Sequence, residues 1–81
     1  MRIVLDTNVL VSGLMNPHGV PGRIVDLLLN GKISLLYDDR ILSEYRDVLE
    51  RPYLGIDPSL AQAVLSYIRL SGEQVSAQLL P

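Results

Sequence analysis

Two acidic residues, Asp6 and Glu44, have the surroundings that a catalytic carboxylate needs. Asp6 directly follows the apolar run Ile3-Val4-Leu5, which has the composition of a buried parallel strand. Open α/β sheets bind ligands just beyond the carboxyl ends of such strands, so Asp6 is expected to face a ligand crevice. A second reading is that Asp6 caps a helix starting near Asn8, because Asp commonly accepts hydrogen bonds from first-turn amides. The two readings are compatible.

Glu44 falls within a predicted helix over residues 39–51 and lies roughly 40° outside its apolar stripe on a helical wheel. The stripe consists of Ile41, Leu42, Tyr45, Val48 and Leu49. An acid at this margin can be held close to the sheet, whereas acids on the opposite face are expected to be solvated and to form pairs such as Arg46 with Glu50. The structural alternative for Glu44 is a boundary residue paired with Arg40 or Arg51.

Two carboxylates that converge from different elements could bind a hard divalent cation. Mg²⁺ or Mn²⁺ takes oxygen ligands and keeps several waters, and such an ion both polarises a phosphoryl group and lowers the pKa of a bound water. Asp6 and Glu44 meet only if the helix over 39–51 packs across the strand ends. Asn8 and Ser12 would then orient Asp6 or a water.

Strand and helix patterns alternate along the chain. Residues 2–5, 32–37 and 73–80 are predicted strands, and residues 8–15, 21–29, 39–51 and 58–71 are predicted helices. The fold class is therefore α/β, a parallel sheet flanked by helices in the order β-α-α-β-α-α-β.

Composition limits the possible functions. The 81 residues form at most one small domain, and 48% are hydrophobic, which favours a covered surface or a partner. A net charge of −2 gives no general attraction to polyanions. The absence of cysteine excludes disulfides and thiolate metal sites. Since no apolar stretch approaches the length of a membrane span or signal peptide, we expect a cytoplasmic protein with no membrane association.

Three segments carry a resemblance to a known family. They are the opening Val4-Leu5-Asp6-Thr7-Asn8-Val9-Leu10-Val11-Ser12-Gly13, the stretch 39–45 with Ser43-Glu44, and Leu49-Glu50-Arg51-Pro52. Together they resemble PIN-domain proteins, most closely the VapC-like toxin components of toxin–antitoxin systems. The resemblance implies a metal-dependent endoribonuclease that uses Mg²⁺ or Mn²⁺, acts on RNA and is restrained by a cognate antitoxin protein. It places the family's first two metal-site acids at Asp6 and Glu44, and its small polar residue at Thr7 and Asn8.

The sequence departs from the family pattern in length. Family members are longer and carry one or two further acids, and no residue after Glu73 is acidic. Residues 1–81 are therefore expected to be the N-terminal portion of a single PIN-like domain, weakly active or inactive by themselves. We also expect an open edge on the first strand and self-association into a homo-oligomer through it.

Two other functions remain open. A non-catalytic PIN-like module for interaction or oligomerisation is consistent with the missing acids. A haloacid-dehalogenase-like phosphohydrolase also opens with a strand ending in Asp, but it needs a second Asp two residues later, where this chain has Asn8.

Overall fold

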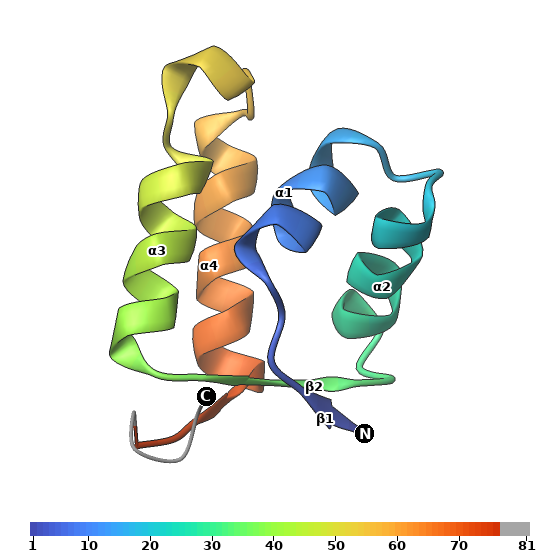
Figure 1. The fold of residues 1–81 in the computed structure, drawn as a ribbon, viewed down its shortest axis with the longest axis vertical. Coiled ribbons are helices and arrows are strands. Elements are labelled where there is room, and N and C mark those ends of the chain that lie inside the picture. Colours follow the sequence, from blue (N-terminus) through green and yellow to red (C-terminus); the bar gives the residue numbers. More distant parts are fainter. Residues whose placement is uncertain (77–81) are drawn as a thin grey trace.

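A computed structural model of the chain describes residues 1–76. Three short parallel strands, β1 (Arg2–Ile3), β2 (Ser34–Tyr37) and β3 (Glu73–Gln74), form a sheet in the order β1-β2-β3. Arg2 pairs with Ser34 in the first ladder, and Leu36 pairs with Glu73 in the second. Within the described residues, β1 is an edge strand. The strands run along the bottom of Figure 1, with the helices above them.

The helices are α1 (Thr7–Met15), α2 (Val20–Leu29), α3 (Asp39–Leu49) and α4 (Pro58–Ser71), and a short 3-10 helix, η1 (Pro52–Leu54), follows α3. The α/β class and the order β-α-α-β-α-α-β are confirmed. In Figure 1, α3 and α4 stand side by side, as do α1 and α2. None of the helices in residues 1–76 combines the length and apolar character needed to cross a bilayer.

Aspartate side chains cap the N-termini of three of the four α-helices. Asp6 accepts a hydrogen bond from the Asn8 amide at 2.7 Å, Asp38 from the Ile41 amide at 2.8 Å and Asp57 from the Ser59 amide at 2.8 Å. Each carboxylate satisfies an amide that has no partner inside the helix, and each lies at the favourable end of the helix dipole.

The core forms where the apolar faces of the helices meet the sheet. Its largest fully buried side chains are Leu10, Leu35, Tyr45, Leu49 and Ile68. The predicted stripe of α3 is buried at Leu42, Tyr45 and Leu49 and half-buried at its margins. Gly13 lets α1 approach α2 closely, because a Cβ at this position would lie 2.4 Å from Cγ2 of Val25.

All three strands are shorter than predicted, and the second spans Ser34–Tyr37 instead of 32–37. The first was expected to extend over residues 2–5, but β1 ends at Ile3. The physical reason is a change of partner, since the Leu5 carbonyl accepts a hydrogen bond from the Tyr45 hydroxyl and so leaves the ladder. The third was expected over 73–80, of which β3 covers Glu73–Gln74. Residues 77–80 lie outside the described part of the chain.

Candidate active and metal site

Asp6 and Glu44 line the same cleft, which has a volume of about 420 Å³. One wall is the continuous segment from β1 into α1, and the other is a face of α3. The lining residues are Val4, Leu5, Asp6, Thr7, Asn8, Ile41, Glu44, Val48 and Arg51. The packing of α1 against α3 therefore brings together two acids that are 38 positions apart in the sequence.

Helical geometry builds the α3 wall. Ile41, Glu44 and Val48 are spaced by three and four residues, and Arg51 continues this face just beyond the helix end. Ile41 and Val48 are both half-buried, and Ile41 packs against the core, while the exposed side chain of Glu44 lies between them in the cleft. The position of Glu44 at the margin of the apolar stripe thus places it beside Asp6.

Asp6 is both a helix cap and a cleft residue, the two possibilities that the sequence suggested. Its Oδ1 caps α1 through the Asn8 amide, and its exposed side chain lies in the cleft at the carboxyl end of β1. Within residues 1–76, its Oδ2 makes no hydrogen bond. The cap fixes one oxygen and leaves the other for a ligand.

Glu44 is held by Thr7. The Thr7 hydroxyl donates to Oε2 of Glu44 at 2.9 Å, a direct link between α1 and α3. The alternative pairings of Glu44 are not formed, because Arg40 binds Asp38 at 3.3 Å and Arg51 binds Asp47 at 3.1 Å. Within residues 1–76, the expected ion pair of Arg46 with Glu50 is absent, and the i,i+4 ion pair formed near the end of α3 is that of Arg51 with Asp47.

Tyr45 has a role at this site that sequence reasoning missed, since it predicted only packing. The buried hydroxyl of Tyr45 donates to the carbonyl of Leu5, the residue before Asp6, and so fastens the end of β1 to α3. Burial, together with the negative charges of Glu44 and Asp6, raises the pKa of Tyr45 to about 12. Both acids therefore act electrostatically on one buried hydroxyl. A fully buried tyrosine needs a partner for its hydroxyl, which is a rule that could have suggested this contact.

Of the other predicted site residues, Asn8 lies in the cleft and Ser12 does not. Asn8 lines the cleft with an exposed side chain, and its amide is bound to Asp6. Ser12 lies on α1 with an exposed side chain and is not among the residues lining the cleft. The structure brings together Asp6, Thr7, Asn8 and Glu44.

The donor set of the cleft fits a hard cation that keeps much of its water. Oδ2 of Asp6 and Oε1 of Glu44 make no hydrogen bonds within residues 1–76, so each carboxylate has an oxygen to offer. No group of three or more histidine, aspartate or glutamate side chains in that part of the chain could surround an ion. The two acids supply part of a coordination sphere, and Thr7 orients one of them.

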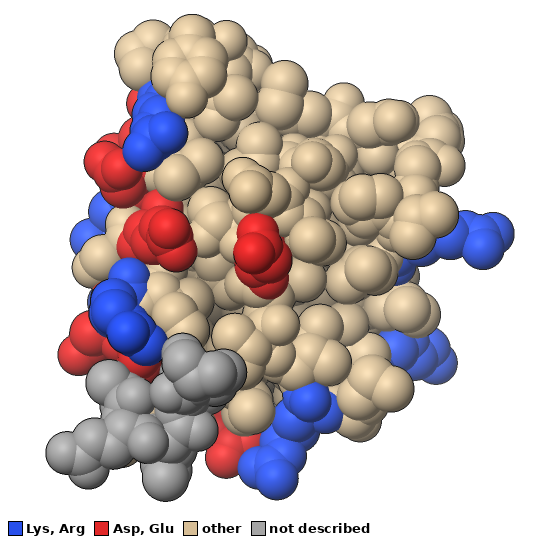
Figure 2. Space-filling model, viewed as in Figure 1, with Lys and Arg blue, Asp and Glu red and all other residues tan. Residues whose placement is uncertain are grey.

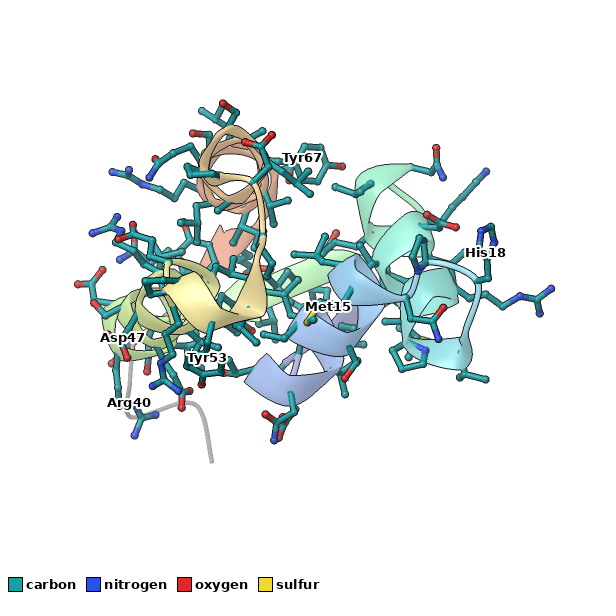
Figure 3. All side chains as sticks on the ribbon, turned by 90° about the horizontal axis from the view of Figure 1, so that it is seen from above. Met15, His18, Arg40, Asp47, Tyr53 and Tyr67 are labelled. Atoms are coloured by element: carbon teal, nitrogen blue, oxygen red, sulfur yellow. The ribbon has the colours of Figure 1, made fainter. Side chains whose placement is uncertain are left out.

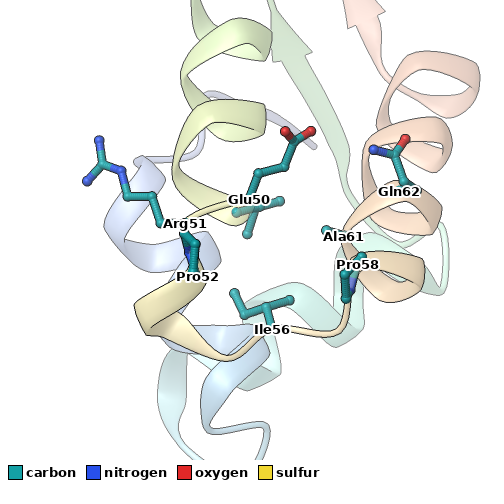
Figure 4. A pocket seen from close by; sticks show the side chains of 8 residues that line it. Glu50, Arg51, Pro52, Ile56, Pro58, Ala61 and Gln62 are labelled. Atoms are coloured by element: carbon teal, nitrogen blue, oxygen red, sulfur yellow. The ribbon is translucent and has the colours of Figure 1, made fainter.

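A second cavity of about 420 Å³ lies where α3, η1 and α4 meet. Figure 4 shows the carboxylate of Glu50 and the amide of Gln62 above an apolar floor formed by Ile56, Pro58 and Ala61. Because only one carboxylate lines this cavity, it lacks the paired acids of the Asp6–Glu44 cleft.

Comparison with known proteins identifies the family. A family model described as PIN domain matches residues 2–78, nearly the whole chain. The chain belongs to the PIN domain family. This PIN domain chain is also similar to an uncharacterised protein of Methanocaldococcus jannaschii, with 46% identity over 44 residues. The match covers 54% of this chain, and the chain spans only 28% of the length of that relative. No solved structure gives a significant match.

Proposed function

We propose that this PIN domain is a metal-dependent endoribonuclease, with Asp6 and Glu44 as its catalytic acids and ligands of Mg²⁺ or Mn²⁺. Membership of the family supports a nuclease-type function in general. The observation that carries the proposal further is the cleft after β1, where two carboxylates from different elements each have an oxygen that makes no hydrogen bond within residues 1–76.

Each residue of the cleft has a separate proposed role. Asp6 and Glu44 would hold the cation, and the bound ion would supply a polarised phosphoryl group and an activated water. Thr7 holds Glu44 toward α1, and the backbone N–H of Asn8 donates to one oxygen of Asp6, so both acids are oriented before an ion arrives. Tyr45 keeps the backbone next to Asp6 against α3.

Isothermal titration with Mn²⁺ tests the metal site. Sites with few charged oxygen ligands bind weakly, so we expect a Kd on the order of millimolar that Asp6→Asn abolishes. Asp57→Asn is the matched control, because Asp57 caps α4 through the same type of contact but lies outside this cleft. Equal loss of binding in both variants, or unchanged binding in Asp6→Asn, would reject the site.

Cleavage of RNA tests the activity. With two acids in the site, we expect little cleavage of a labelled single-stranded RNA in Mn²⁺, and Asp6→Asn or Glu44→Gln should remove what remains. Cleavage that persists in both variants would show that another group performs the reaction. Metal binding without any cleavage would favour a non-catalytic interaction module.

We further propose that the protein is a toxin component whose activity is restrained by a small antitoxin protein. This role is supported by the family resemblance of the sequence and by exposed apolar side chains that a partner could cover, among them Met15, Val20 and Leu70. Because little cleavage is expected, expression of the chain should slow bacterial growth only slightly, and Asp6→Asn should remove that effect. Equal growth inhibition by Asp6→Asn would separate any toxicity from the nuclease site.

A further inference from the structure

The cleft that contains Asp6 and Glu44 also contains a cation. Arg51 is the one basic side chain among the nine residues that line it. Because the proposed substrate is a polyanion and the cleft carries two carboxylates, a group that attracts phosphate is needed beside the metal ligands. We propose that Arg51 binds a backbone phosphate of single-stranded RNA, next to the phosphate held at Asp6 and Glu44. This inference rests on the proposed nuclease function.

Arg51 is oriented by two neighbours. Its Nη2 donates to Asp47 at 3.1 Å, and its Nη1 donates to the Tyr53 hydroxyl at 3.3 Å. A guanidinium group has five N–H donors, so these contacts leave others for a phosphate. Arg51 also borders the cavity between α3 and α4, and Figure 4 shows its guanidinium pointing away from Glu50. The side chain is thus fixed beside the acid cleft before RNA binds.

The spacing along α3 indicates which phosphate Arg51 reaches. It follows Glu44 by seven residues, the last two of which lie beyond the end of α3, so the separation is roughly 10 Å if each residue adds 1.5 Å. Phosphates along one strand of a stacked nucleic acid are about 3.4 Å apart along its axis. Arg51 therefore contacts a phosphate one or more nucleotides away from the bond to be cleaved. It is a substrate-binding residue and does not act on the reacting atoms.

The face seen in Figure 2 has no other area that would attract RNA strongly. Acidic and basic side chains are interleaved over α3, at the left of that view, and no continuous basic area is present on the face. Since the chain has a net charge of −2, a local contact must replace general attraction. Arg51 supplies that contact in the cleft.

Binding of oligouridylates of two lengths tests the proposal. Fluorescence anisotropy of 5′-labelled octauridylate in Ca²⁺ should show about tenfold weaker binding for Arg51→Ala than for the unaltered chain. The slope of log K against log salt should become shallower by about 0.7, the loss of one single-strand phosphate contact. The dinucleotide UpU has one phosphodiester, so its affinity should be the same for both proteins.

Two control variants separate RNA binding from a structural role. Asp47→Asn removes the same ion pair but keeps the cation, so it should leave octauridylate binding unchanged or tighter. Arg46→Ala removes an arginine of α3 that lines a different cleft, and it should have little effect. The proposal is overturned if Arg51→Ala binds octauridylate like the unaltered chain, if Asp47→Asn weakens binding equally, or if the unaltered chain does not bind. Mn²⁺ titration of Asp6→Asn tests the nuclease site separately.

Discussion

At the scale of single residues, Tyr45 links the core to the candidate site. Its ring is fully buried, and its hydroxyl donates to the Leu5 carbonyl. Each of these two residues has an acid next to it in the sequence, since Glu44 precedes Tyr45 and Asp6 follows Leu5. A buried carbonyl without a partner costs free energy, so this one hydrogen bond favours the backbone position that places Asp6 in the cleft.

The titration of Tyr45 predicts a loss of stability in alkali. Its pKa is about 12 in the folded chain and 10.0 in the reference state, so the folded protein keeps the proton more tightly. The stabilisation is complete below pH 10 and is lost as the pH rises toward 12, by up to about 3 kcal/mol for two pH units. Urea unfolding across this range should show the decrease.

Tyr45→Phe is the variant that checks the cause. Near neutral pH it should lower the free energy of unfolding by about 1–3 kcal/mol, because the Leu5 carbonyl loses its partner. It should also flatten the decrease between pH 10 and pH 12 that Tyr45 produces. Tyr53→Phe is the control, since Tyr53 is 77% exposed. An alkaline decrease of the same size in Tyr45→Phe would assign it to another group.

Thr7 is expected to matter for metal binding through Glu44. Thr7→Val keeps the shape of the side chain but removes the hydroxyl that donates to Oε2. Since groups that orient metal ligands contribute about 10–100-fold to affinity, Mn²⁺ titration should show at least a tenfold weaker Kd. Ser12→Ala, outside the cleft, should bind Mn²⁺ normally. Weaker binding in Ser12→Ala would instead support the sequence-based role of Ser12.

At the scale of elements, the contact between α1 and α2 determines where α1, and with it Asp6, can lie. Gly13 is buried, and a Cβ there would also meet the Pro21 carbonyl oxygen at 2.7 Å. Backbone atoms cannot move aside as a flexible side chain can, so the two helices would have to separate. Figure 3, seen from above, shows the two helices side by side, with Met15 at the end of α1 and His18 in the turn between them.

Gly13→Ala should therefore destabilise the fold by about 1–3 kcal/mol through overpacking, measured by urea unfolding. Gly19→Ala is the matched substitution, because its Cβ would meet the flexible amide end of Asn16 at 3.3 Å. We expect a smaller change for Gly19→Ala. If the two variants unfold at the same urea concentration, the close approach at Gly13 does not limit the packing of α1.

At the scale of the whole molecule, the edge of the sheet predicts self-association. Within residues 1–76, β1 pairs only with β2, and the neighbouring Val4 is 42% exposed. An unpaired edge with an apolar side chain can pair with a second copy. Light scattering should show a dimer or larger assembly, and Val4→Lys should reduce it.

Leu70→Lys is the comparison for that experiment, because Leu70 is 87% exposed and belongs to helix α4 instead of a strand. It should leave the measured mass unchanged. A monomeric mass for the unaltered chain, or equal loss of association in both variants, would argue against pairing through the β1 edge.

The sequence alone determined the elements and most of their ends. Asp6, Asp38 and Asp57 could be identified as helix caps because capping depends on residues only two or three positions apart. The apolar stripe of the helix over 39–51 predicted which side of α3 is buried, since helical periodicity is a local property. The position of Glu44 at the edge of that stripe followed from the same rule.

Only the tertiary structure decided which distant residues meet. The bonds from Thr7 to Glu44 and from Tyr45 to the Leu5 carbonyl depend on how α1 packs against α3, and no local pattern encodes that packing. The same packing ended β1 at Ile3 and placed Arg51 in the acid cleft. Sequence rules describe interactions within a helix or strand, whereas a site between two elements depends on the close packing of the whole core.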